Sequence, residues 1–94
     1  MNKYEIMIIV KPDVDEEARN AVLDNFKNVI VNDGGVIDEV TEMGMRELAY
    51  EIKKYTKAYY VVLDVHATAA GIEEFERLAR INANFLRTMT LRRD

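Results

Sequence analysis

The chain has 94 residues, of which 49% are hydrophobic and 32% charged, with a formal net charge of −4. This length suits one domain, 1–94, with a modest core, and no apolar run approaches the roughly 18 residues that a membrane span needs. Without cysteine there can be no disulfide, thiolate metal site or cysteine nucleophile, and the N-terminus lacks the residue order of a secretory signal, so we expect an intracellular protein.

The first part of the chain predicts a strand followed by a helix. Residues 3–10 are rich in β-branched side chains, and Pro12 ends the strand because proline cannot donate to a sheet ladder. Asp13 or Asp15 then caps a helix that ends at Gly34, where glycine can adopt a left-handed conformation. The expected buried stripe of this helix is Ala18, Val22, Phe26, Val29 and Ile30.

The middle of the chain predicts two strands joined by a short turn. The first covers 36–54 and contains Gly44, where a β-bulge would re-phase its two halves. Three alternate apolar residues of this strand are expected to hold the sheet to its helices: Leu48, Tyr50 and Ile52. A turn at Tyr55-Thr56-Lys57 leads to the next strand, 58–66.

The last part of the chain predicts a second helix and a final strand. Thr68 caps the helix, and the strand covers 85–92. The expected buried stripe of the helix is Ile72, Phe75, Leu78 and Ala79. The resulting order β-α-β-β-α-β is typical of an α+β, ferredoxin-like fold, with a four-stranded antiparallel sheet and two helices on one face.

Acidic charge is concentrated on the two predicted helices. Segments 13–33 and 68–82 hold nine acidic and four basic residues, whereas the remaining residues hold eight acidic and nine basic ones. An acidic helix face usually serves solubility. The alternative is that this layer faces away from a polyanion, so that the net charge does not exclude a nucleic-acid partner.

The sheet face without helices is predicted to carry too many apolar residues for a solvated surface. Strand alternation directs six of them to that face: Met7, Ile9, Tyr60, Val62, Met89 and Leu91. Exposed apolar patches of a few hundred Å² usually mark a partner site. Alternatively, a loop or terminus covers this face, or the assignment of residues to the two faces of the sheet is wrong by one residue.

The residue types offer little for catalysis or metal binding. His66 is the only histidine, and the carboxylates Asp15-Glu16-Glu17 and Glu73-Glu74 are sequential on helices and so diverge. Lys57 and Tyr59 match part of the pattern of an RNA-recognition motif, but Tyr60 replaces its small residue. We therefore expect no catalytic residue, metal or cofactor.

Basic residues gather on the predicted strands and on the hairpin between the second and third: Lys3, Arg46, Lys53, Lys54, Lys57, Arg87, Arg92 and Arg93. Surface lysines commonly only solubilise. Arg46 and Arg87 differ because an arginine within an apolar strand pattern needs an acceptor, and phosphate or carboxylate suits its planar guanidinium.

The run Gly44-x-Arg46-Glu47-Leu48-Ala49-Tyr50-x-Ile52-Lys53 resembles the signature of the bacterial small-subunit ribosomal protein S-six family. The resemblance extends to Tyr4-Glu5, Pro12, Gly34 and Asn84-x-x-Arg87-x-Met89, and so along nearly the whole chain. One difference lies at the end: some members carry an acidic or disordered tail, which is absent after Arg93-Asp94.

The resemblance implies a non-enzymatic protein of the cytoplasmic small ribosomal subunit. Members of this family form a heterodimer with ribosomal protein S-eighteen, and the pair binds the central domain of 16S rRNA during assembly. Among the basic residues, we expect RNA contacts from Lys3, Arg46, Lys53, Lys54, Arg87 and Arg92. We expect the apolar sheet face to meet the protein partner through Met7, Ile9, Tyr60, Val62, Met89 and Leu91. We expect no membrane or small-molecule partner and a monomeric isolated chain.

Two alternatives on the same fold stay open: a small-molecule-binding or hydrolytic domain, and a homodimeric interaction module. An acylphosphatase-like hydrolase needs an arginine beside a glycine-rich cradle after the first strand, where Lys11-Pro12-Asp13 stands instead. An amino-acid-binding regulatory domain is typically fused to an enzyme. A stable dimer of the isolated chain would favour the homodimeric module.

Overall fold

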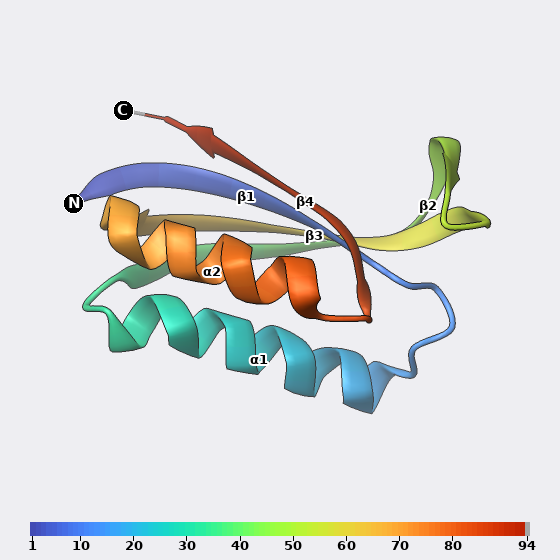
Figure 1. The fold of residues 1–94 in the computed structure, drawn as a ribbon, viewed down its shortest axis with the longest axis horizontal. Helices are drawn as coiled ribbons and strands as arrows, with labels where there is room; N and C mark the ends of the chain where they lie inside the picture. The colour runs from blue at the N-terminus through green and yellow to red at the C-terminus, as the bar shows by residue number, and fades with distance from the viewer. Residues whose placement is uncertain (94) are drawn as a thin grey trace.

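A computed structural model describes residues 1–93, which form four strands and two helices in the predicted order (Figure 1). The elements are β1 Asn2–Val10, α1 Glu16–Asn32, β2 Val36–Ile52, β3 Tyr55–Ala67, α2 Ala69–Ile81 and β4 Phe85–Arg92. The strands pair in the order β2-β3-β1-β4, and each neighbouring pair is antiparallel. Figure 1 shows both helices on one side of the sheet, which confirms the predicted ferredoxin-like fold.

Each helix begins at a polar side chain that caps its free N–H groups. The Ala18 N–H donates to Asp15 Oδ1 at 2.8 Å, so α1 starts after Asp15 and not after Asp13. The Gly71 N–H likewise donates to Thr68 Oγ1 at 3.0 Å. With lengths of 17 and 13 residues, neither helix within residues 1–93 is long and apolar enough to cross a membrane.

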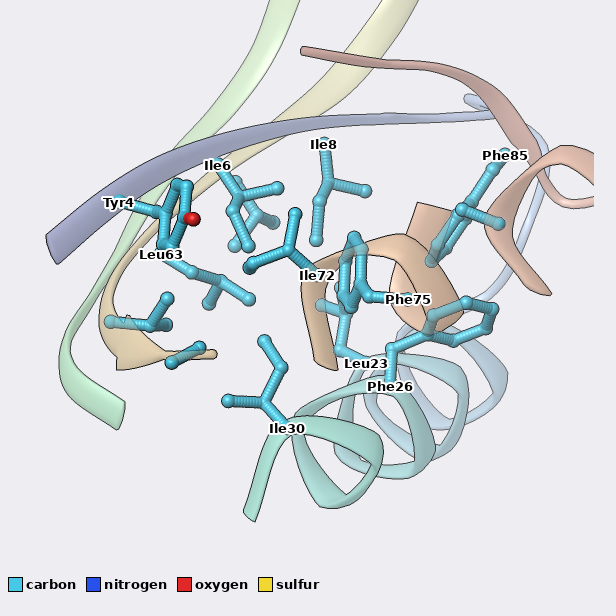
Figure 2. Close-up of a cluster of buried hydrophobic side chains, with 14 of the residues drawn as sticks. Tyr4, Ile6, Ile8, Leu23, Phe26, Ile30, Leu63, Ile72, Phe75 and Phe85 are labelled. Carbon is cyan, nitrogen blue, oxygen red and sulfur yellow. The ribbon is translucent and has the colours of Figure 1, made fainter. Parts of the chain in front are cut away.

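The main core lies between the helices and the side of the sheet that faces them (Figure 2). Alternate residues of β1 and β3 are fully buried there: Ile6, Ile8, Val61, Leu63 and Val65. The Phe26 and Phe75 rings meet edge to face at 5.4 Å, and the Phe85 ring lies 4.5 Å from Phe26. These aromatic contacts join α1, α2 and the start of β4.

The buried stripe of α1 differs in part from the prediction, because Ala18 is exposed and Leu23 is buried. Beside Ala18, the guanidinium carbon of Arg19 lies 3.6 Å from the centroid of the Tyr59 ring. A long arginine stem can cover apolar surface while its charged end remains near water. Arg19 therefore covers the edge of the core that Ala18 was expected to fill.

The turn between β2 and β3 is shorter than predicted and lies earlier in the chain. Ile52 pairs with Tyr55, which leaves Lys53 and Lys54 as the two turn residues, with φ of +49° and +72°. Positive φ at both central residues is the geometry of a type I′ turn, whose twist matches that of the flanking strands. The expected turn at Tyr55-Thr56-Lys57 is wrong, because these residues already belong to β3.

Three register shifts bend β2 against β3. They fall between Ile37 and Glu39, between Glu42 and Gly44, and between Glu47 and Ile52. The second shift includes Gly44, whose φ is +81°, and confirms the bulge predicted there. Beyond the third shift, the end of the hairpin curls away from the helices (Figure 1).

The curled hairpin end forms a second, smaller core on the side of the sheet opposite the helices. Its buried members are Ile9, Ala58 and Leu86, and the half-buried side chains packed against them are Leu48, Ile52, Tyr55 and Tyr60. The expectation that Leu48, Tyr50 and Ile52 hold the sheet to its helices is therefore wrong. The register shift after Glu47 turns Leu48 and Ile52 onto the other side, and Tyr50 is 59% exposed.

Candidate nucleic-acid and protein interface

The side of the sheet that the helices leave uncovered, here termed the open face, carries rows of paired residues from β3, β1 and β4. Met7 pairs with Val62 on one side and with Met89 on the other. The register also pairs Glu5 with Leu91. Because directly opposite residues of an antiparallel pair project to the same face, Met89 and Leu91 both lie on the open face.

Five apolar side chains keep exposed surface on the open face and form what we term the open-face patch: Met7, Tyr60, Val62, Met89 and Leu91. Met89 is 38% exposed and Leu91 is 55% exposed, whereas the other three are half-buried. Ile9 was expected beside them as an exposed residue, and this is wrong. The hairpin end covers Ile9 and leaves only 3% of it exposed.

An apolar groove of about 240 Å³ lies between the hairpin end and the open-face patch. Its lining residues are Ile9, Leu48, Ala49, Tyr50, Ile52, Tyr60, Arg87 and Met89. At its rim, Nη1 of Arg87 donates a hydrogen bond to the Tyr50 hydroxyl. This bond ties β4 to the hairpin and holds one cation beside the apolar surface.

The other half of the open face, near the chain ends, is polar. His66 Nδ1 lies 2.5 Å from Asp38 Oδ2, and Nε of Arg93 donates to Glu5 Oε2 at 2.7 Å. Lys3 pairs with His66 in the register and is exposed at this end. The open face is thus divided into an apolar half beside the hairpin and a charged half beside the termini.

The six expected RNA-binding residues do not form one cluster. Arg46 lies on the open face near the hairpin, where its Nε donates to the Met43 carbonyl at 3.2 Å. Arg92 pairs with Tyr4 and therefore lies on the helix side of the sheet, where Nη2 donates to Asn2 Oδ1 at 3.0 Å. Of the six, the structure brings only Lys53 and Arg87 together in one pocket, and Lys54 lies beside Lys53 in the turn.

A basic residue that the sequence analysis did not select, Arg80, lies in the same pocket. This pocket of about 260 Å³ is lined by Lys53, Ala79, Arg80, Phe85, Leu86, Arg87 and Thr88. In the sequence, Arg80 falls within the second predicted helix segment, 68–82. Its place in the last turn of α2, just before the connection to β4, is the signal that could have identified it.

The partial match to an RNA-recognition motif has no structural basis at Tyr59. That ring faces the helices, where the Arg19 guanidinium stacks on it. Tyr60 alone of this tyrosine pair faces the open face, and it is half-buried by the hairpin end. A row of bases stacked on successive aromatic side chains of β3 is therefore excluded.

Comparison with known proteins agrees with the resemblance of the sequence signature. The family model described as ribosomal protein S6 matches residues 3–92. The small ribosomal subunit protein bS6 of Halalkalibacterium halodurans is 47% identical over 89 residues, which are 95% of this chain and 94% of that protein. The protein of the same name from Exiguobacterium sp. is 44% identical over 90 residues, which are 96% and 95% of the two chains.

A solved structure extends the likeness to three dimensions. The crystal structure of 30S ribosomal protein S6 from Thermotoga maritima superimposes with a TM-score of 0.92 at 36% identity, over 98% of this chain and 87% of that one. Sequence and fold thus agree along almost the full length. The chain belongs to the ribosomal protein S6 family, the S-six family that its signature resembles, and is a protein of the small ribosomal subunit.

Proposed function

We propose that this chain binds the central domain of 16S rRNA together with ribosomal protein S-eighteen, as a heterodimer, during assembly of the small subunit in the cytoplasm. Its role is structural, without catalysis or a cofactor. The open-face patch is the observation that carries the proposal. It is an exposed apolar surface at the centre of a sheet face, beside cations at Arg46 and Arg87.

The open-face patch supports a protein partner. Burial of a few hundred Å² at about 25 cal/mol per Å² yields several kcal/mol before the costs of association. A basic partner such as S-eighteen would also supply phosphate contacts that a chain with a net charge of −4 cannot supply alone. The proposed partner residues are therefore the patch itself, with Ile9 beneath the hairpin end as its support.

The RNA-contacting groups are proposed to be Lys3, Arg46, Lys53, Lys54, Arg87 and Arg92. The isolated chain should bind a 16S central-domain fragment weakly, because each phosphate contact adds only about 0.7–0.9 to the salt slope. The heterodimer should bind it tightly. Replacing Arg46 and Arg87 together by alanine should lower both the affinity and the salt slope of the heterodimer, as measured by filter binding at several salt concentrations. Unchanged values would contradict this assignment.

The partner site is tested by a matched pair of variants. Met89→Glu introduces a charge at a position 38% exposed on the open face, and Val40→Glu introduces one at a position 39% exposed on the helix side of β2. Calorimetric titration with S-eighteen should show binding for Val40→Glu and the wild type, and a loss of at least tenfold for Met89→Glu. Equal affinities would place the partner elsewhere. A stable micromolar dimer of the isolated chain in sedimentation would favour the homodimeric alternative.

A further inference from the structure

Three cations from three separate elements line one pocket at the edge of the sheet. Lys53 comes from the β2–β3 turn, Arg80 from the last turn of α2, and Arg87 from β4. The remaining lining residues are the apolar Ala79, Phe85 and Leu86, with the hydroxyl-bearing Thr88. No carboxylate among residues 1–93 contributes to this lining, although the whole chain is acidic.

Within residues 1–93, no ion pair neutralises the positive charge of this pocket. The ion pairs among residues 1–93 involve neither Lys53, Arg80 nor Arg87. Glu76 lies one helical turn before Arg80 but forms no ion pair with it in the described chain. Among residues 1–93, Arg87 donates only to the neutral Tyr50 hydroxyl, so further guanidinium N–H groups can serve a bound anion.

Backbone strain at the β2–β3 turn is a second observation that points to a ligand. Both turn residues have positive φ, a conformation in which asparagine and glycine are favoured and in which lysine costs about 1 kcal/mol. An Asn-Gly turn would satisfy the hairpin better. Retention of strained residues is expected where their side chains serve a function. Here the first of them, Lys53, lines the pocket.

The pocket also has a suitable position relative to the proposed partner site. β4 is an edge strand, and its consecutive residues Arg87 and Thr88 project to opposite sides of the sheet, so the pocket wraps around that edge. Arg87 borders both the pocket and the apolar groove. A protein on the open face would therefore leave the pocket accessible from the side.

We propose that Lys53, Arg80 and Arg87 together hold one backbone phosphate of the bound RNA, an inference that rests on the proposed function above. A volume of about 260 Å³ is below the range of roughly 300–1,000 Å³ typical of pockets for drug-sized ligands, which favours a single charged group. Two guanidinium groups and an ammonium suit the oxygens of a phosphodiester. Arg80 thereby becomes an RNA-binding residue.

The test compares two glutamine variants on the same helix, each in complex with S-eighteen. Arg80→Gln removes a pocket cation, whereas Arg77→Gln removes an exposed arginine that pairs with Glu74 outside the pocket. On a 16S central-domain fragment, Arg80→Gln should weaken binding about tenfold and lower the salt slope by about one. Arg77→Gln should leave both unchanged. Equal RNA binding by both variants would overturn the assignment of this pocket as a phosphate-binding site.

A second variant separates loss of the site from loss of the fold. Lys53→Asn removes the cation and relieves turn strain, so it should unfold at the same or a higher temperature while it binds RNA more weakly. A variant that binds RNA like the wild type would contradict the role of Lys53. Neutral methylphosphonates placed one at a time along the RNA should weaken wild-type binding strongly at one position. At that position the loss should be smaller for Arg80→Gln, which retains only two of the three cations. If methylphosphonate substitution weakens RNA binding of both proteins equally at every position, the proposal that the pocket holds a single phosphate is overturned.

The outcomes distinguish this inference from the proposed function. If the wild-type heterodimer does not bind the central-domain fragment, the proposed function fails. If the wild-type heterodimer binds the fragment and the Arg80→Gln heterodimer binds it equally well, only the assignment of the pocket as a phosphate site fails. If Arg80→Gln instead loses affinity for S-eighteen in the absence of RNA, the pocket serves a carboxylate of the protein partner, and the phosphate assignment is overturned.

Discussion

Arg19 shows how one side chain can serve a core without being apolar. Its guanidinium carbon lies 3.6 Å above the centre of the Tyr59 ring, and its Nε is buried with no hydrogen-bond partner among residues 1–93. The ring face supplies the favourable electrostatic environment that a hydrogen bond would otherwise supply. The same contact makes Tyr59 unavailable to any ligand on the open face.

We expect Arg19→Gln to lower the free energy of unfolding by about 1 kcal/mol, because it removes the cation from the ring face and shortens the stem that covers the core edge. Tyr59→Phe should change it by much less, since the ring remains. Urea unfolding of both variants checks this. A Tyr59→Phe variant as unstable as Arg19→Gln would show that the hydroxyl, and not the ring, provides the contact.

At the scale of elements, the hairpin end determines how much of the open face remains exposed. Leu48 and Ile52 lie over Ile9 and Ala58, and so divide the face into a covered part and the open-face patch. Without this cover, Ile9 would extend the patch as the sequence pattern predicts. The extent of the open-face patch is thus set by a packing contact between two ends of the same sheet.

Leu48→Ala should lower the free energy of unfolding by about 1–2 kcal/mol. This is less than for a fully buried leucine, because Leu48 is only half-buried and the substitution removes less apolar surface from the core. It should also speed amide hydrogen exchange at the hairpin end more than in β1, since the contact is local. Exchange that rises equally in both strands would indicate that the hairpin end unfolds only with the whole sheet.

A charged pair on α2 predicts a pH effect with a definite sign. Arg77 donates to the Glu74 carboxylate, and this hydrogen bond holds the pKa of Glu74 below its usual value, while the same bond raises the pKa of Arg77. A lowered carboxyl pKa stabilises the fold above the unfolded-state pKa, and this contribution disappears as the pH falls through the folded-state value. Because both side chains are exposed to solvent, the effect on stability is small.

Arg77→Gln should therefore raise the pKa of Glu74, measured by a carboxyl-carbon NMR titration of both proteins. The thermal stability of the two proteins should converge toward low pH, where Glu74 is protonated in each. An unchanged Glu74 pKa in the variant would mean that the bond does not persist in solution.

At the scale of the whole molecule, strand alternation and helix caps predicted the element order, the bulge at Gly44 and the boundaries of β4. The β2–β3 turn was missed because Lys53 and Lys54 carry no turn signal of their own, and the Ile52–Tyr55 pairing imposes their conformation. The burial of Ile9 was missed because it arises from the curl of a distant hairpin. Arg80 was missed because periodicity cannot show which helix end meets which strand.

Under the proposed function, binding of S-eighteen should stabilise the whole chain through mass action. With free S-eighteen at 100 times its dissociation constant, the free energy of unfolding should rise by about 2.7 kcal/mol. Amide hydrogen exchange of the buried β1 residues in isotope-labelled protein measures this rise. Met89→Glu should lose most of the rise and Val40→Glu should retain it. A rise of the same size in both variants would argue against the open-face patch as the contact.

The three register shifts of β2 affect how readily copies of the protein associate with one another. β2 is a 17-residue edge strand, and such an edge can pair with another copy and start a fibre. Its bends interrupt a continuous template, and its acidic residues repel an identical edge: Asp38, Glu39, Glu42, Glu47 and Glu51. Glu39→Thr with Glu42→Thr should therefore increase light scattering on prolonged incubation. The acidity of this edge would then protect the protein from self-association.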